Sequence, residues 1–111
     1  MTVPDSLIDD AARRFALLSD PTRLRILAVL LEHEPMTVTE LSDALGIAAP
    51  NVSQHLARLN AGRLVGREKQ GRTVHYRIVD PSLPALCELM CTSLMEQAGR
   101  LSIQTSRARA G

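Results

Sequence analysis

The chain has 111 residues and a net charge of only +1, and 45% of its residues are hydrophobic, which suffices for one small domain. With no Trp, one Tyr and one Phe, its core is expected to be aliphatic, and the scarcity of aromatics argues against a stacking platform for single-stranded nucleic acid. No apolar run approaches the ~18 residues of a membrane span, and no signal peptide is recognisable. Two cysteines without such a signal predict a cytoplasmic protein with free thiols.

Two helices are predicted at the start of the chain. The first is capped by Asp5 or Ser6 and runs to about Leu18. Residues 19–21, Ser-Asp-Pro, break it and start a second helix, with the aspartate as the cap and the proline in the first turn. This helix is expected to end near residues 33–35 and to bury four leucines: Leu24, Leu27, Leu30 and Leu31.

Residues 37–61 predict a helix-turn-helix. Thr37 and Glu40 fit a capping box, in which a hydroxyl and a carboxylate each bind a free backbone N–H at a helix start. Gly46 can adopt the left-handed conformation that ends this helix. Pro50 suits the first turn of the next helix, where its missing N–H is not needed.

The second helix of this motif is predicted to read DNA. Its apolar residues, Val52, Leu56 and Leu59, are expected to face the core. The remaining side chains are then exposed, and they are of the kind that hydrogen-bond to base edges in a major groove. These candidate DNA-binding residues are Asn51, Ser53, Gln54, His55 and Arg58.

A β-hairpin is predicted to follow. The first strand starts at about Leu64, the turn falls at Gln70-Gly71, and Val74, Tyr76 and Ile78 alternate on the returning strand. Together with the helix-turn-helix, this hairpin gives the predicted fold class: mainly α with a small β-hairpin wing, a winged helix-turn-helix.

Charge is unevenly distributed along the chain. Residues 46–79 carry six basic residues and one acidic residue, whereas the rest carries seven basic and eleven acidic ones. A positive segment of this kind is the expected footprint of a surface that binds DNA phosphates. The alternative is a charged hairpin that is merely solvated. On the DNA interpretation, the wing contributes Lys69 and Arg72.

A long last helix is predicted to start after Asp80-Pro81-Ser82 and to end at about Leu101, with residues 102–111 as a frayed tail. Residues 1–101 then form a single domain with dimerising terminal helices. The apolar stripe of the last helix is long for one small domain, so we expect a homodimer that buries it. A twofold dimer also offers two recognition helices to a palindromic site. The stripe contains Leu83, Leu86, Cys87, Met90, Leu94, Ala98 and Leu101.

With these features, the chain resembles the ArsR/SmtB winged-helix repressors over about residues 10–98. The most specific matches are residues 18–27 (LSDPTRLRIL), residues 52–56 (VSQHL) and residues 71–77 (GRTVHYR). The resemblance implies a dimeric repressor that leaves its operator when an inducer binds, and the inducer is often a metal ion. It also implies that the helix with Asn51, Ser53, Gln54 and His55 enters the major groove.

The chain departs from this family at two sensing sites and at one cap. Where the family has Cys-Val-Cys-Glu-Leu, residues 37–41 read Thr-Val-Thr-Glu-Leu, which offers no thiol. At a second site Asp80 and Glu96 match, but Ser82 and Ser93 stand where imidazoles are needed. Ala48 replaces the usual capping serine before the recognition helix, which should weaken that cap by ~1 kcal/mol.

Two cysteines remain as candidate metal ligands. Cys87 and Cys91 are spaced i, i+4, which places both on one side of the last helix. Two thiolates can bind one soft ion: As(III), Hg(II), Cd(II) or Pb(II). A third ligand would come from Glu88, from His33 or from a partner subunit. The alternative is that Cys87, within the apolar stripe, is a small core residue.

The function predicted from the sequence is sequence-specific repression at double-stranded operator DNA, relieved by a soft ion at Cys87 and Cys91. One alternative is a repressor that senses thiol oxidation or has no inducer. Another is a winged-helix module that binds a protein. No catalytic motif is present, so no enzymatic activity and no other cofactor is predicted.

Overall fold

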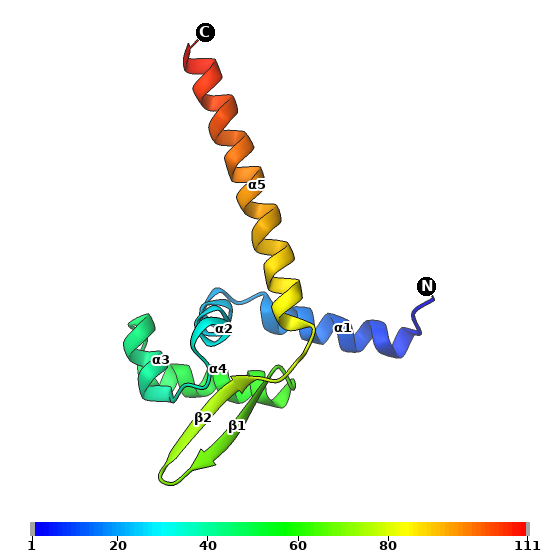
Figure 1. Cartoon of the computed structure of the whole chain (residues 1–111). Helices are drawn as coiled ribbons and strands as arrows, with labels where there is room; N and C mark the ends of the chain where they lie inside the picture. The colour runs from blue at the N-terminus through cyan, green and yellow to red at the C-terminus, as the bar shows by residue number, and fades with distance from the viewer. Residues whose placement is uncertain (1, 111) are drawn as a thin grey trace. The chain divides into compact units, whose positions relative to one another are not determined.

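The computed structural model describes residues 2–110, and the side chains of residues 2–100. Five helices and one two-stranded antiparallel sheet follow one another along this part of the chain (Figure 1). They divide into two units, one ending at Asp80 and one starting at Pro81. The elements of the first unit are α1 (Asp5–Leu18), α2 (Pro21–His33), α3 (Val38–Leu45), α4 (Ala49–Ala61), β1 (Val65–Gln70) and β2 (Thr73–Ile78).

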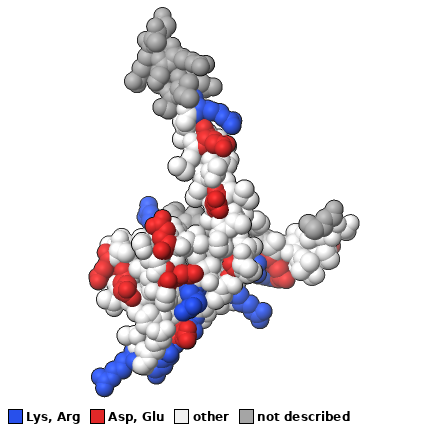
Figure 2. All heavy atoms as spheres, in the orientation of Figure 1, with Lys and Arg blue, Asp and Glu red and all other residues white. Residues whose placement is uncertain are grey.

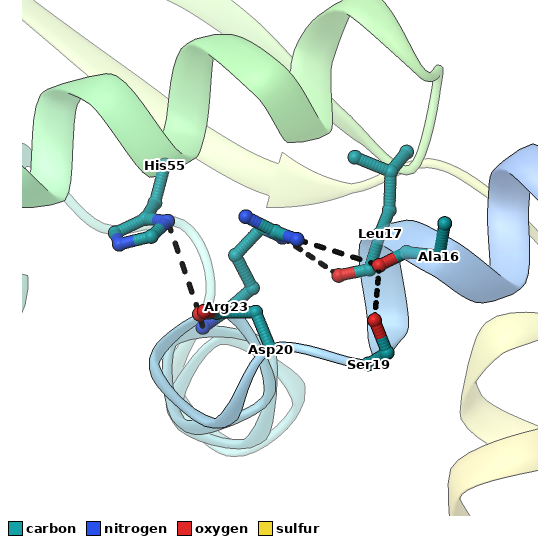
Figure 3. Close-up of polar contacts among 6 residues, drawn as sticks. All are labelled: Ala16, Leu17, Ser19, Asp20, Arg23 and His55. Carbon is teal, nitrogen blue, oxygen red and sulfur yellow. Dashed lines mark hydrogen bonds and ion pairs between the residues drawn. The ribbon is translucent and has the colours of Figure 1, made fainter.

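Helices α1 and α2 are joined by a short polar turn. The Asp20 carboxylate accepts a hydrogen bond from the backbone N–H of Arg23 at 2.9 Å, which confirms the predicted cap of α2. The predicted cap of α1 is wrong, because Pro4 occupies the cap position and Asp5 is already helical. Arg23 is buried, and its Nε donates to the carbonyl of Leu17 at 2.7 Å (Figure 3). This side chain therefore satisfies the free end of α1.

The helix-turn-helix, α3 and α4, forms as predicted. The Thr37 hydroxyl accepts from the N–H of Glu40, and the Glu40 carboxylate accepts from the N–H of Thr37, so the capping box is complete. Gly46 ends α3 at φ 66°. The Ser42 hydroxyl then donates to the Ile47 carbonyl, which closes the turn into α4.

The core lies between α2, α3, α4 and the hairpin, and it is aliphatic as predicted. Helix α2, however, buries a face rotated by roughly 60° from the expected one at 100° per residue. Leu24 is 42% exposed and Leu31 half-buried, whereas Ile26 is fully buried. The rotation brings Arg23 against the end of α1. The fully buried core residues are Ile26, Leu27, Leu30, Leu41, Val52, Leu56, Leu59 and Leu64.

The hairpin pairs β1 with β2 from Val65 opposite Ile78 to Gln70 opposite Thr73. Its turn is therefore Gly71-Arg72, one residue later than predicted, with Gly71 at φ 63°. The base of the hairpin is tied to the segment after α2. There the Glu34 carboxylate accepts a hydrogen bond from the N–H of Ile78 at 2.6 Å.

The second unit consists of helix α5 (Leu83–Ala110), which begins directly after Ser82 as predicted. The carbonyl of Ser82 accepts the first helical hydrogen bond, from Leu86 at 3.0 Å. The predicted end of this helix at about Leu101 is wrong, because α5 continues to Ala110 and the backbone of residues 102–110, expected as a frayed tail, is helical. Residue 111 lies outside the described residues. Within the described part of the chain, no helix is both long and apolar enough to cross a membrane.

Candidate nucleic-acid interface

The recognition helix α4 separates apolar from polar residues by face. Val52, Leu56 and Leu59 are fully buried and fix the helix on the core. Alternating with them, three of the predicted base-reading residues, Asn51, Ser53 and Gln54, are exposed, as is Arg58. The cap of this helix is Ala48, which makes no side-chain cap hydrogen bond, as the sequence predicted.

His55 was predicted to be exposed, and this prediction is wrong. Its side chain is 23% exposed and turns toward the start of α2, where Nδ1 lies 4.0 Å from the Asp20 carboxylate (Figure 3). That distance is too long for a hydrogen bond. The reason for the burial is the start of α2, which lies against this side of α4. Its contact with DNA stays a prediction.

Asp20 is therefore shared between two elements. The backbone N–H of Arg23 is the main cause that lowers the pKa of its carboxyl below the ordinary value of 3.8, and the charges of Arg23 and His55 add to it. The carboxylate form thus predominates over the range in which DNA-binding proteins work. Asp20 holds the start of α2 and at the same time faces the inner side of the recognition helix.

The hairpin carries the basic residues of the wing. Arg67, Lys69 and Arg72 are exposed, and within the described chain none of them makes an ion pair. Lys and Arg gather at the tip of the hairpin in Figure 2. Arg77 differs, because its Nη2 lies 3.4 Å from the Glu68 carboxylate on the paired strand. The wing thus presents three uncompensated cations to an acidic partner.

The two cysteines lie on α5, in the second unit. Cys87 is half-buried and Cys91 exposed. Partial burial raises the pKa of the Cys87 thiol, and the neighbouring Cys91 raises it further. Among the residues that the structure describes, no group of three or more His, Cys, Asp or Glu side chains could hold a metal ion. The described part of one copy therefore brings no third ligand to these two thiols.

Three features of the site escaped the sequence analysis. The buried Arg23 looked like any exposed helical arginine, although its position three residues after a capping aspartate is a usable signal. Glu34 was predicted only to lie at the end of a helix, and its hydrogen bond to the hairpin was not predicted. Arg63 has a left-handed backbone conformation at φ 62°. From sequence, this conformation is expected at a glycine, here the neighbouring Gly62.

Comparisons with known proteins agree with this geometry. A sequence model described as "Bacterial regulatory protein, arsR family" matches residues 20–66. The HTH-type transcriptional regulator KmtR of Mycobacterium tuberculosis is 43% identical over 79 residues, which are 68% of this chain and 60% of KmtR. A probable mercury resistance operon repressor of Streptomyces lividans is 34% identical over 103 residues, 93% of this chain and 82% of that one.

Among solved structures, a homodimeric winged helix-turn-helix DNA-binding domain from Mycobacterium bovis, described as a possible ArsR-family transcriptional regulator, has a TM-score of 0.79 at 27% identity. The match covers 88% of this chain and 93% of that domain. Curated relatives such as KmtR are longer, since this chain spans 60% of its length.

Proposed function

This chain belongs to the ArsR family of bacterial regulatory proteins, and on that premise we propose that it is a homodimeric repressor of transcription that binds double-stranded operator DNA. The observation that carries the proposal is the exposed polar face of α4 beside a hairpin with three unpaired cations. The relatives are transcriptional regulators, which supports a regulatory rather than an enzymatic role. The proposed function places the protein in the cytoplasm, where bacterial operator DNA lies.

Base reading is assigned to the start of α4. Asn51, Ser53 and Gln54 are uncharged side chains that donate and accept hydrogen bonds, as base edges in the major groove require. The buried Val52 and Leu56 hold the helix in a fixed orientation on the core. Rigid support of this kind lets a few side chains discriminate among bases.

Phosphate binding is assigned to the wing and to Arg58. Lys69 and Arg72 lie at or next to the hairpin turn, where they can reach the backbone that flanks a major groove. Because they lack carboxylate partners in the described chain, no internal ion pair has to break before they bind. Their contribution should be independent of sequence and should fall with salt.

A second copy of the chain is the proposed partner of the terminal helices. On α1, Leu7, Ile8 and Phe15 are between 51% and 60% exposed. On α5, Met90 is 57% and Leu94 is 55% exposed, whereas Leu83, which the sequence placed in the same stripe, is buried. The homodimeric structure of the Mycobacterium bovis domain supports a twofold arrangement.

The proposed inducer is a soft metal or metalloid ion at Cys87 and Cys91. Two thiols at i, i+4 fit soft ions such as As(III), Hg(II), Cd(II) or Pb(II) better than Zn(II) or Ni(II). Since one copy provides no third ligand among its described residues, we assign the third ligand to the second copy. The similarity to a probable mercury resistance repressor supports an ion of this class. Such an ion supplies metal–thiolate bonds that hold the cysteines together.

Two other functions have some support. The exposed Cys91 permits oxidation, and since the i, i+4 spacing suits a disulfide poorly, oxidation would join two copies. A repressor without an inducer would use neither thiol. A protein-binding module would need the basic wing only for solubility, and its association with nucleic acid would depend little on salt.

One experiment separates these functions. A double-stranded operator is selected from a random library, and fluorescence anisotropy then measures its affinity for the protein over a series of salt concentrations. We expect log K to fall linearly with log salt, and we expect Cd(II) or Hg(II) to release the DNA at lower concentration than Zn(II). Cys87→Ser and Cys91→Ser should each abolish release without weakening binding in the absence of the ion. Release from a double serine variant would place the sensor elsewhere.

A further inference from the structure

A hollow of about 380 Å³ lies between α1 and the end of α4, within the first unit. Three arginines line it: Arg13 and Arg14 from α1, and Arg63 from the turn after α4. The lining contains one carboxylate, that of Asp10. We infer that this hollow binds a small oxyanion, a phosphate or a carboxylate, at a second effector site that does not depend on the cysteines.

The hollow rests on a close contact between two helices. A Cβ atom at Gly62 would overlap Cδ1 of Leu17, so a larger residue at this position would require the Leu17 side chain to move. Three of the carbonyls at these helix ends are already occupied. That of Leu17 accepts from Arg23, and those of Leu59 and Asn60 accept from the backbone N–H groups of residues 64 and 63. The helix ends therefore offer few free acceptors that would repel an anion.

Arg63 is the least expected residue of the hollow. It has φ 62°, and it is the single non-glycine residue with positive φ in the described part of the chain. Glycine adopts this conformation without penalty, whereas a side chain resists it. Strained positions of this kind often coincide with function, where the side chain itself is needed. The guanidinium of Arg63 makes no ion pair within the described residues.

The other two arginines have donors to spare. Arg13 uses Nη2 on Asp10 at 2.9 Å, in a pair whose side chains are 73% and 65% exposed, and Arg14 uses Nη1 on Asp80 at 3.0 Å. A guanidinium has five N–H donors in a planar fork that matches phosphate and carboxylate oxygens. Each arginine can therefore keep its aspartate and still donate to a ligand. With Asp10 and Asp80 both counted, three guanidiniums and two carboxylates leave a net charge of +1, which Arg63 carries because it makes no ion pair among the described residues.

The hollow lies where a bound ligand could affect the relative position of α1 and α4. At 100° per residue, Ile8 and Phe15 lie about 100° or more from every α1 position that lines the hollow, whereas Leu7 lies only ~20° from Arg14. A second copy that covered Ile8 and Phe15 would leave the hollow open. A bound oxyanion would link α1, a proposed dimer helix, to the end of the recognition helix, and so would bias their relative position.

The test is a titration of the full-length protein with sodium phosphate and, separately, with sodium succinate, both at constant ionic strength set with chloride. ¹H–¹⁵N spectra are expected to show saturable shifts at Gly62 and Arg63. Arg63→Gly should weaken binding about tenfold or more, because it removes a charge-assisted hydrogen bond. The same substitution should raise Tm, since glycine relieves the backbone. Phosphate binding in excess of succinate, or the reverse, identifies the oxyanion.

Two further variants make the result specific. Asp10→Asn should tighten binding several-fold, because it removes the one lining carboxylate and frees Arg13. Arg25→Ala, at an exposed arginine of α2 outside the hollow, should leave binding unchanged. Equal shifts in the wild type, Arg63→Gly and Arg25→Ala would overturn the inference, because they would show a general effect of anions. It would also fall if Arg63→Gly lowered the salt slope of operator binding by about one unit, since Arg63 would then contact DNA phosphate.

Discussion

The guanidinium of Arg14 lies 3.0 Å from the carboxylate of Asp80, which joins α1 to the segment that follows β2. The Asp80 side chain is 6% exposed and that of Arg14 is 51% exposed. Asp80 matches a place that the sequence resemblance associates with metal binding. Because an arginine already holds its carboxylate, a cation at Asp80 would have to displace Arg14. This agrees with the absence of imidazoles at Ser82 and Ser93.

Arg14→Ala is expected to destabilise the fold. It removes the partner of a carboxylate that is almost fully buried, and the free energy of unfolding should fall by about 1–3 kcal/mol, less than for a fully buried pair because Arg14 is half-exposed. Urea unfolding followed by circular dichroism measures this. Arg13→Ala, in an ion pair exposed on both sides, should change the value by less than ~1 kcal/mol. Equal losses for the two variants would contradict the importance given to the Asp80 pair.

Removing one cation from the wing should weaken DNA binding and make the affinity less dependent on salt concentration. Arg72→Ala is expected to lower affinity for all DNA sequences and to reduce the slope of log K against log salt by about one unit. Arg25→Ala is the matched control, since Arg25 is also exposed but lies on α2. An unchanged slope for Arg72→Ala would remove the wing from the proposed interface.

A charge on the apolar stripe of α5 should prevent dimer formation. Met90→Lys would bury an unpaired ammonium in the proposed twofold interface and cost several kcal/mol of association. Leu89→Lys is the control, because Leu89 is 71% exposed on the same helix but points roughly 120° away from the stripe. Sedimentation at micromolar concentration compares the two. If the Met90 variant remained a dimer, the interface would lie on another face.

Binding of a soft ion should become tighter as pH rises. Partial burial and the neighbouring Cys91 raise the pKa of the Cys87 thiol, so at neutral pH the thiol is protonated and an ion must displace the proton. Below that raised pKa, the apparent affinity should increase about tenfold per pH unit for each proton released. Titration with Cd(II) between about pH 6 and about pH 8 measures it. A flat profile would mean that Cys87 is not a ligand.

Sequence patterns predicted most of the fold because local chemistry determines it. The capping box at Thr37 and Glu40, the left-handed Gly46 and the buried face of α4 all depend on residues within one or two helical turns. Each of these predictions is confirmed. The order of helices and the hairpin followed from the same local signals, apart from a turn placed one residue too early.

Apart from the cap of α1, the hairpin turn and the end of α5, the predictions that failed depend on contacts between distant residues. The elements that pack against α2 determine which of its faces is buried. The positions of the leucines within α2 alone do not show this. His55 is half-buried because Asp20 and the start of α2 lie against it, thirty-five positions earlier in the chain. The hollow beside Arg63 lies where Gly62 comes close to Leu17. None of these pairs has a signature in sequence spacing.

Because the His55 side chain turns inward, the recognition helix has fewer kinds of side chain available to contact bases. The exposed readers at its start, Asn51, Ser53 and Gln54, include two amides and no guanidinium. Amides pair bidentately with adenine, whereas guanine is read mainly by arginine or lysine. Each half-site should therefore hold its most constrained positions at adenines. Exchanging such an adenine for guanine should cost about 1–3 kcal/mol of binding, whereas guanines elsewhere in the operator should be freely replaceable.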